Sequence, residues 1–237
     1  MYKGKRILAT ICARGGSKGV KNKNIRLLDN IPLIAYSLNI IKNNTFIDDY
    51  VVSTDSEEII SVVKELGFQI EFKRPDELSG DNVGRIDAIQ HAYSWKQERS
   101  NSPFDIIVDL GVATPLKSMD DLNNAIKLCI DSNAENVFSV CESIKNPYFN
   151  MVEVKNDKVK LVKESYEITS RQTAPVVYEM NDGFNVWTPE SLFSDNPQFN
   201  PSTKMYVMPR ERSVDIDEEE DFLIAKIIKE KLNTQLP

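Results

Sequence analysis

Short apolar runs alternate with helical stretches along the first 142 residues, and this alternation limits the possible folds more than any other feature of the chain. Apolar runs typical of strands lie at 7–12, 50–54, 69–72, 105–110 and 136–141. Residues 33–41, 56–66, 85–98 and 119–130 carry helical spacing or helix start signals. Strands that alternate with helices are typical of βαβ units. The sequence therefore predicts an α/β fold with three layers around a mostly parallel sheet.

The pattern changes after residue 142. Alternating residues at 148–154 and 158–162 flank the triplet KND at 155–157, which predicts a β-hairpin. We expect residues 143–190 to form a β-rich insertion, whose edge serves a partner subunit, within a single domain spanning 1–237. A last helix is expected at 218–232, with one apolar face made by Leu223, Ile224, Ile227, Ile228 and Leu232.

Composition excludes several classes of function. The chain has 237 residues and a net charge of −7, which does not suggest a nucleic-acid-binding protein. Its single histidine, His91, argues against a His-containing triad or a multi-His metal site. Three cysteines lie far apart without a CxxC pair, as is typical of free thiols in a reducing cytoplasm. No apolar run approaches the roughly 20 residues of a membrane span, so we expect a soluble, cytoplasmic protein that binds neither nucleic acid nor membrane.

A basic, glycine-rich segment directly follows the first predicted strand. Residues 12–24 read CARGGSKGVKNKN. Glycines let backbone N–H groups approach an anion closely, and ligands bind beyond the carboxyl ends of the strands in open α/β sheets. Residues 1–28 contain eight Lys or Arg and no Asp or Glu, so the remainder carries about −15. This contrast indicates a triphosphate pocket rather than an ordinary solvated loop.

The segment has neither the G-x-x-x-x-G-K-[ST] spacing of a P-loop nor the G-x-G-x-x-G dinucleotide fingerprint. It resembles instead the signature A-R-x-x-S-K-G, followed by K-N, of the acylneuraminate cytidylyltransferases, the CMP-sialic acid synthetases. The run ICARGGSKGVKNKNIR is most similar to the bacterial branch that acts on legionaminic acid and related sugars. The resemblance continues in order through segments at 53–55, 74–78, 114–117, 146–150, 171–172 and 215–217.

The resemblance implies a nucleotide-diphospho-sugar-transferase-like fold, which is Rossmann-like, and a homodimer joined through the 143–190 insertion. It implies that Arg14, Lys18 and Lys23 hold the triphosphate and neutralise charge on the leaving pyrophosphate. In the family, the loop that corresponds to 74–85 covers the nucleotide. The expected nucleotide-binding residues are therefore Ala13, Gly15, Gly16, Ser17, Asn24, Arg74, Asp81 and Arg85.

Two aspartates alternate with apolar residues in the sequence VDID at 214–217. On an extended segment both carboxylates point to one face, with their origins roughly 6.5–7 Å apart. Mg²⁺ uses one or two carboxylates together with waters and substrate phosphates, and in the family this pair binds the metal. Asp217 could instead cap the following helix, but capping does not explain Asp215. We therefore expect Asp215 and Asp217 to bind Mg²⁺.

The expected sugar side departs from the family in two places. Gly111 stands where relatives carry Gln or Asp, and Asn185 replaces the usual Tyr of the N-G-A-I-Y stretch that begins at Asn181. The pair RQ at 171–172 matches the family, whose arginine faces the sugar acid, and a guanidinium can bind a carboxylate bidentately. The identity of the sugar stays open, and the expected sugar-binding residues are Arg171, Gln172, Asn181, Asn185 and Phe199.

These features predict Mg²⁺-dependent transfer of CMP from CTP to the anomeric hydroxyl of a nine-carbon 2-keto sugar acid (a nonulosonic acid such as sialic or legionaminic acid), which gives a CMP-sugar and pyrophosphate. Three alternatives stay open. A 3-deoxy-manno-octulosonate cytidylyltransferase is the nearest, although the RQ pair and the placement of DID favour a nine-carbon acceptor. A glycosyltransferase would use D-x-D on a preformed nucleotide sugar, whereas the basic loop suggests a free triphosphate. A nucleotide-binding regulatory protein would have lost turnover, against which the intact basic and acidic residues argue.

Overall fold

The computed structural model is described for residues 1–16, 19–80, 83–164, 168 and 170–234. Its main sheet has the strand order β10-β6-β9-β5-β1-β4. Neighbouring strands run parallel, except that β9 is antiparallel to both β5 and β6. The strands are β1 (Ile7–Cys12), β4 (Asp49–Ser53), β5 (Ile106–Leu110), β6 (Asn136–Glu142), β9 (Tyr178–Trp187) and β10 (Lys204–Val207). The predicted mostly parallel sheet is confirmed.

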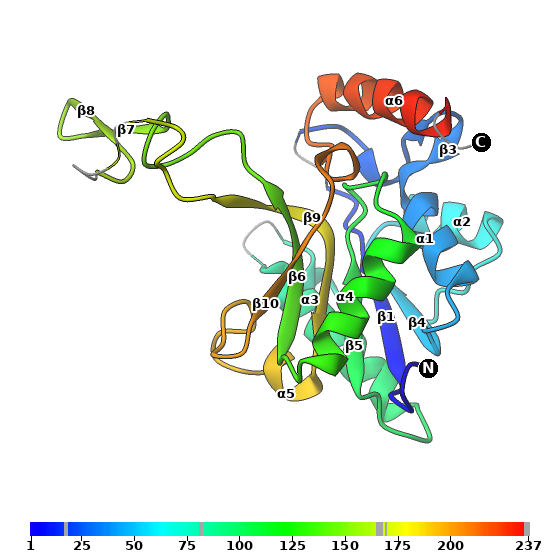
Figure 1. Ribbon diagram of the computed structural model, residues 1–237. Helices are drawn as coiled ribbons and strands as arrows, with labels where there is room; N and C mark the ends of the chain where they lie inside the picture. Colours follow the sequence, from blue (N-terminus) through cyan, green and yellow to red (C-terminus); the bar gives the residue numbers. More distant parts are fainter. Residues whose placement is uncertain (17–18, 81–82, 165–167, 169, 235–237) are drawn as a thin grey trace.

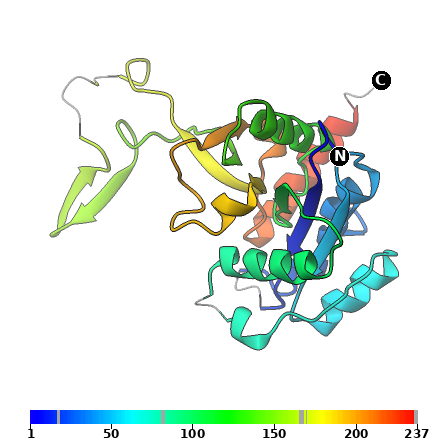
Figure 2. The same cartoon turned by 90° about the horizontal axis from the view of Figure 1, so that it is seen from below.

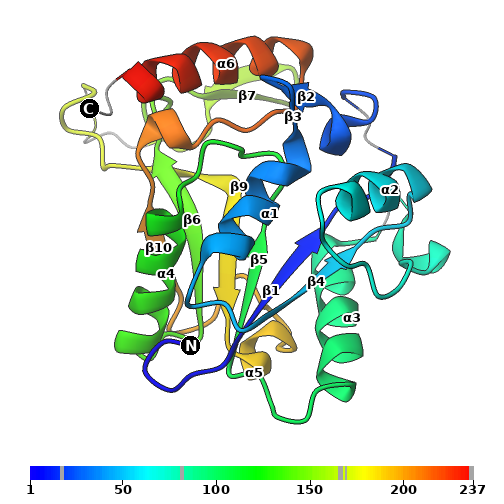
Figure 3. The same ribbon diagram turned by 90° about the vertical axis from the view of Figure 1, so that its right-hand side faces the viewer.

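Helices cover both faces of this sheet, which confirms the three-layer fold (Figures 2 and 3). Alternate residues of β1 point to opposite layers because successive side chains of a strand face opposite sides. Ile7, Ala9 and Ile11 join the larger core beneath α1 and α4, whereas Leu8 packs with residues of α3. The helices are α1 (Leu33–Asn43), α2 (Glu57–Glu65), α3 (Arg85–Glu98), α4 (Met119–Asp131), α5 (Pro189–Leu192) and α6 (Glu219–Thr234). Short elements complete the chain: β2 (Leu27–Leu28), β3 (Ile31–Pro32) and the 3-10 helices η1 (Lys23–Ile25), η2 (Asp76–Leu78) and η3 (Arg210–Arg212).

Helix α2 begins and ends as its sequence predicts. The Ser56 hydroxyl accepts a hydrogen bond from Ile59 N at 3.3 Å and so caps the first turn. Gly67 follows the helix with φ +82°, a left-handed conformation that glycine adopts without steric cost. Ser56 thus sets where α2 begins after β4, and Gly67 sets where the helix ends.

The predicted strand at 69–72 is wrong, because this segment does not enter a sheet. Two isolated bonds attach it to β4 and its flank: Gln69 N donates to the Tyr50 hydroxyl at 3.0 Å, and Arg74 N donates to Thr54 O at 2.8 Å. Bonds so far apart do not form a β-ladder. The segment instead carries Arg74 to the carboxyl end of β4.

The expected insertion at 143–190 divides into two parts. The predicted hairpin is confirmed as β7 (Val152–Lys155) and β8 (Lys158–Leu161), joined by Asn156 and Asp157 at positive φ. We call the described residues between 143 and 177 the arm, which projects from the rest of the chain (Figure 1). The prediction is wrong for 178–187, because β9 lies inside the main sheet and Phe184, Val186 and Trp187 are fully buried there. A role for the arm in dimerisation stays a prediction.

The last helix is confirmed, but its predicted apolar face is only partly correct: Ile228 packs against the main core, whereas other residues of that face are exposed. Phe222 and Ala225 are buried, whereas Leu223 and Ile227 are about two-thirds exposed, at 65% and 66%. Lys229 of this helix donates to the Tyr36 hydroxyl of α1 at 2.9 Å and pairs with Asp29 at 3.0 Å, which ties the helix to its neighbours. In the described part of the chain, none of the helices combines the length and apolar character needed to span a membrane.

A buried ion pair joins η3 to α4 and gives a prediction about stability. Arg212 donates to both carboxylate oxygens of Asp121 at 2.8 Å, and the Asp121 side chain is only 1% exposed. We expect Arg212→Gln to lower the free energy of unfolding at pH 7 by about 3 kcal/mol, because it leaves a buried carboxylate without its cation. Urea unfolding measures this loss. Arg210→Gln is the matched control, since its pair with Glu179 is half exposed and contributes under about 1 kcal/mol.

The same pair sets a pH dependence. Burial on its own raises the pKa of Asp121, but hydrogen bonds from Arg212 and Ser118 outweigh it and hold this pKa below the ordinary 3.8. The group therefore stabilises the fold above about pH 3.8, and this contribution is lost as the pH falls through the lowered pKa. We expect the stability difference between wild type and Arg212→Gln to shrink below pH 3.8. A constant difference would show that the pair acts by packing alone.

Candidate active site

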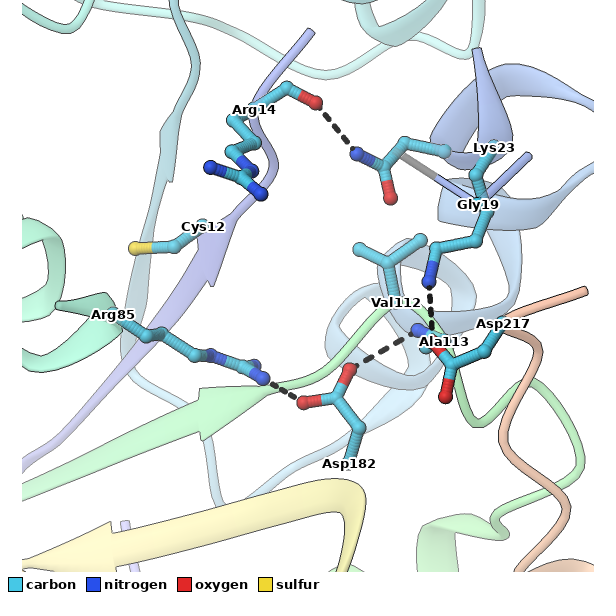
Figure 4. Close-up of a pocket in the computed structure, with 10 residues that line it drawn as sticks. Cys12, Arg14, Gly19, Lys23, Arg85, Val112, Ala113, Asp182 and Asp217 are labelled. Carbon is cyan, nitrogen blue, oxygen red and sulfur yellow. Dashed lines mark hydrogen bonds and ion pairs between the residues drawn. The ribbon is translucent and has the colours of Figure 1, made fainter. Parts of the chain in front are cut away.

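A cleft opens beyond the carboxyl ends of β1 and β5, beside the middle of β9 (Figure 4). One pocket, with a volume of about 340 Å³, is lined by Cys12, Arg14, Gly19, Lys23, Asn24, Arg85, Val112, Ala113, Asp182 and Asp217. A second pocket of about 310 Å³ extends toward η2 and the start of α3, and Arg74, Ser79 and Gly84 help to line it. Cys12, Arg14 and Arg85 line both pockets, so the two form one continuous cleft.

The basic glycine loop forms one wall of this cleft. Gly15 N donates to Asp55 Oδ1 at 2.9 Å, and Asn24 Nδ2 donates to the carbonyl oxygen of Arg14 at 2.9 Å. The first bond ties the segment to the chain after β4, and the second folds the segment back on itself. Together they hold Arg14 on the cleft wall. A Cβ atom at Gly19 would overlap the carbonyl oxygen of Asp217, so only glycine allows this approach.

The remaining residues predicted in this region have different positions. Ala13 is buried and its N–H donates to Ser53 O at 3.0 Å, so it continues β1 toward β4 and does not line the cleft. Gly16 is exposed. Ser17, Lys18 and Asp81, which we expect to contact the nucleotide, lie outside the described residues.

Lys23 joins the basic loop to the predicted metal-binding aspartates. Its ammonium group donates to Ile216 O at 2.7 Å and to Asp217 Oδ1 at 3.1 Å (Figure 4). The Lys23 side chain is 17% exposed and Asp217 is 76% exposed, so the pair lies at the mouth of the pocket. The fold thus places a cation and a carboxylate side by side, although they are 194 residues apart in the chain.

Asp215 is held more firmly than Asp217. Its carboxylate accepts a hydrogen bond from the Thr114 hydroxyl, and both of its oxygens accept from Asp182 N at 3.1 Å. Burial, together with the nearby charge of Asp217, raises the pKa of Asp215 to about 6. The two carboxylates therefore lie close enough to repel each other.

This repulsion bears on the predicted metal. A hard cation between Asp215 and Asp217 would relieve the repulsion, and oxygen ligands are those that Mg²⁺ prefers. Among the described residues, no group of three or more His, Cys, Asp or Glu could hold a metal ion. The arrangement fits a cation held by two carboxylates, with the other ligands supplied by substrate phosphate and water.

The two arginines predicted to contact the nucleotide are fixed by protein groups. Arg74 is 5% exposed and donates to Ser53 Oγ at 2.9 Å and to Ser53 O at 2.7 Å, on the wall of the second pocket. Arg85 binds two carboxylates: Nε and Nη2 donate to Asp109 Oδ2 at 2.9 and 2.6 Å, and Nη1 pairs with Asp182. Arg85 thus contributes less positive charge to the cleft than the sequence suggests.

The predicted sugar-binding residues do not meet at the cleft within one chain. Arg171 and Gln172 are exposed on the arm. The Asn181 side chain accepts from Ser139 Oγ at 2.6 Å and from Gly183 N at 3.1 Å. Asn185 accepts from Gln198 Nε2 at 3.4 Å, and the Phe199 ring lies 5.6 Å from that of Phe138, near the start of β6. In the portion of the chain that is described, none of these five residues lines either pocket.

Sequence reasoning missed three residues of the site. Asp182 lines the cleft; its only signal is an acidic residue where the family stretch has Gly or Ala. Cys12 also lines the cleft, and burial, together with nearby Asp109, raises the pKa of its thiol to about 12, which favours the protonated thiol. Lys117 is buried and donates to Ser37 Oγ, Gly111 O and Thr114 O at 2.9, 2.6 and 2.8 Å, which fixes the loop that follows β5.

Burial, together with the nearby charge of Arg85, lowers the pKa of Lys117 to about 7. This loop carries Thr114, which donates to Asp215, and Ala113, whose N–H donates to Asp182 Oδ2 at 3.2 Å. Lys117 therefore acts on the site by positioning and does not line the cleft. A lysine in the run TPLK was the signal for it.

Comparisons with known proteins identify the family of this chain. A sequence profile described as cytidylyltransferase matches residues 8–231. The chain is 37% identical over 226 residues to the post-translational flagellin modification protein B of Campylobacter coli, covering 95% of this chain and 96% of that one. It is also 37% identical over 222 residues to the CMP-N,N'-diacetyllegionaminic acid synthase of Campylobacter jejuni, covering 94% of each.

Among solved structures, a CMP:2-keto-3-deoxy-manno-octonic acid synthetase complexed with CTP matches with a TM-score of 0.67. The match covers 97% of this chain and 100% of that one at 12% identity, a level that establishes a shared fold alone. The sequence matches carry the family assignment, and they confirm the resemblance seen in the basic loop. The chain therefore belongs to the cytidylyltransferase family and is a CTP-using nucleotidyltransferase.

Proposed function

We propose that this enzyme transfers CMP from CTP to the anomeric hydroxyl of a nonulosonic acid and releases pyrophosphate. The observation that carries the proposal is the meeting of the basic loop and the acidic pair at one cleft, where Lys23 lies 3.1 Å from Asp217. A triphosphate needs cations, and a hard metal ion needs carboxylates. The name of the Campylobacter jejuni relative supports a nonulosonic acid as the acceptor.

The nucleotide would occupy both pockets. The second pocket, beside Arg74 and Gly84, suits the base and ribose, while Arg14 and Lys23 in the first would hold the phosphates. The acceptor oxygen would attack the α-phosphorus in line, the bond to the β-phosphate would break, and pyrophosphate would leave. Holding both reactants in this geometry, and neutralising charge as it develops, would supply most of the rate enhancement.

Asp215 and Asp217 would hold Mg²⁺, which when bound supplies positive charge next to the reacting phosphate and lowers the pKa of the acceptor hydroxyl. Thr114 and the N–H of Asp182 would keep Asp215 in place for this role. Lys23 would pass from its contact with Asp217 to the phosphates as substrate binds, because both are anionic groups within its reach.

Pyrophosphate release tests the proposal. We expect the protein to release pyrophosphate when CTP, Mg²⁺ and N,N'-diacetyllegionaminic acid or N-acetylneuraminic acid are all present, and not when any one is omitted. UTP, ATP and GTP are the nucleotide controls. Release of pyrophosphate only with the eight-carbon 3-deoxy-manno-octulosonate would contradict the nine-carbon acceptor. Binding of CTP without turnover of any sugar acid would contradict the proposed reaction.

The arm supports a further part of the proposal, that Arg171 serves the site of a partner subunit. Arg171 is exposed on the projecting arm, and the hairpin residues Val152, Val154 and Val159 are 63%, 72% and 70% exposed. An isolated two-stranded hairpin is marginally stable in water, so contact with a second copy would stabilise it. In that dimer the Arg171 guanidinium would bind the carboxylate of the sugar acid.

Mixing two inactive variants tests this arrangement. Arg171→Ala and Asp215→Asn are each expected to be nearly inactive as homodimers. After subunit exchange, half of the dimers contain both chains, and each has one site with a native Arg171 and a native Asp215, so activity should return to about a quarter of wild type. Failure to regain activity, with exchange confirmed by native mass spectrometry, would place Arg171 at its own chain's site or outside any site.

A further inference from the structure

Asp182, midway along β9, forms part of the cleft wall (Figure 4), and its side chain is 27% exposed. One carboxylate oxygen pairs with Arg85, and the other accepts a hydrogen bond from Ala113 N at 3.2 Å. The backbone N–H of the same residue donates to both oxygens of Asp215 at 3.1 Å. Asp182 is thus fixed from three sides, directly beside the proposed metal-binding carboxylates.

The neighbouring strand is shaped to make room for this carboxylate. A Cβ atom at Gly111 would overlap both the carbonyl oxygen and the carboxylate of Asp182. Gly111 N also donates to Gly183 O at 3.1 Å, which draws the two backbones together. Any side chain at position 111 would therefore push Asp182 out of the cleft wall. Asp182 can therefore occupy the cleft wall only when position 111 is glycine.

The charges around Asp182 leave it able to bind a ligand. Arg85 is shared with Asp109, which is fully buried and also accepts from the Thr10 hydroxyl at 2.7 Å. One cation thus faces two carboxylates, and the group carries a net charge of about −1. Each oxygen of an ionised carboxylate has two lone pairs, so Asp182 can accept further hydrogen bonds from a molecule in the cleft.

We propose that Asp182 is a specificity-determining residue that accepts hydrogen bonds from hydroxyl or amide N–H groups of the acceptor sugar. This inference rests on the proposed function and deepens it. The acceptor is an acid, so the carboxylate of Asp182 repels the carboxylate end of the acceptor and attracts its hydroxyl and acylamino end. Asp182 in this way sets which end of the acceptor enters beside the aspartate pair, and it favours acceptors that offer hydrogen-bond donors there.

The ribose of CTP also offers hydroxyl groups, but the position of Asp182 favours the acceptor. Asp182, Lys23 and Asp217 line the first pocket, and none of these three lines the second pocket, which is proposed for base and ribose. Its backbone also holds Asp215, beside which the acceptor hydroxyl must lie for the proposed transfer. Kinetics distinguish the two ligands: loss of a contact with the ribose would raise KM for CTP, whereas loss of a contact with the acceptor would raise KM for the sugar.

Steady-state kinetics of Asp182→Ala and Asp182→Asn test the proposal, with three probe acceptors: N,N'-diacetyllegionaminic acid, N-acetylneuraminic acid and 3-deoxy-manno-octulosonate. We expect kcat/KM for the acceptor preferred by wild type to fall about 10- to 100-fold in Asp182→Ala, because one hydrogen bond to a charged group is lost. The loss should lie mainly in KM for the sugar, with KM for CTP changed less than about twofold. The wild-type ranking of the three acceptors should flatten.

The controls separate the possible outcomes. Glu179→Gln changes a half-exposed carboxylate on the same strand and should leave the ranking unchanged. Thermal unfolding should be similar for both Asp182 variants, because Arg85 keeps its pair with Asp109. A rise in KM for CTP with an unchanged KM for sugar would assign Asp182 to the ribose and overturn the proposal, and so would an unchanged acceptor ranking. Failure of wild type to turn over any probe would contradict the proposed function itself.

Discussion

Replacing Asp215 with asparagine should lower turnover about 1,000-fold, because the proposed metal ion would lose one of its two protein carboxylates. Lewis-acid stabilisation by a bound metal contributes several kcal/mol to a transition state, and each 1.4 kcal/mol corresponds to about tenfold in rate. The defect should lie in kcat and in the concentration of Mg²⁺ required, while CTP still binds through the basic loop. Pyrophosphate release across a Mg²⁺ titration measures both.

The fold of this variant should persist. Burial raises the pKa of Asp215 to about 6, so the folded state disfavours its charge, and the amide oxygen of asparagine still accepts from Thr114 or Asp182 N. Glu220→Gln is the matched control, since it removes one exposed charge at the start of α6. Turnover near that of wild type in Asp215→Asn would exclude this residue from the metal site. Thermal unfolding of both variants checks that folding is intact.

Lys23→Met should lower kcat/KM for CTP by about 100-fold or more, through loss of a cation fixed beside the phosphates. Removing a single preorganised electrostatic contact from an active site has effects of about 100- to 1,000-fold. Methionine keeps much of the length of the side chain, and the Asp217 that it leaves unpaired is 76% exposed, so stability should change little. Kinetics with varied CTP and thermal unfolding separate the two effects.

Lys21→Met is the matched control for Lys23, because it removes the same charge from an exposed position of the same loop. If both variants lose the same modest activity, the loop acts through its general positive field, and the specific role of Lys23 is wrong. If Lys23→Met mainly lowers the unfolding temperature, the bond from Lys23 to Ile216 O is structural. We expect neither result.

The fold follows closely from local patterns in the sequence. The continuous apolar run of β1 predicts a strand buried on both faces, and all its residues but Cys12 are buried. Capping residues such as Ser56 mark helix starts because their bonds are local. The position of β9 could not be predicted in this way. Its pairing with β5 and β6 depends on long-range contacts, which the residues of β9 alone do not encode.

The site was predictable where its chemistry is carried by a motif. The basic loop predicts anion binding, and the DID segment predicts cation binding. The fold brings Lys23 of the first and Asp217 of the second together. The sequence does not predict which charged side chains pair with one another inside the cleft. Arg85 looks like a nucleotide contact in the sequence, but Asp109 and Asp182 hold its guanidinium, because β5 and β9 bring two carboxylates within its reach. Such ion pairs form because the order of the strands in the sheet brings residues together that lie far apart in the sequence.

The proposed reaction transfers the α-phosphorus of CTP, as CMP, to the acceptor oxygen. Phosphorus NMR of a reaction with wild-type protein, CTP, Mg²⁺ and N,N'-diacetyllegionaminic acid tests it most directly. We predict one phosphodiester signal and one pyrophosphate signal that grow together in equal amounts as CTP disappears, with the mass of the product equal to that of the CMP-sugar. Formation of CDP and phosphate, or of free CMP without a sugar ester from the start of the reaction, would contradict the claim.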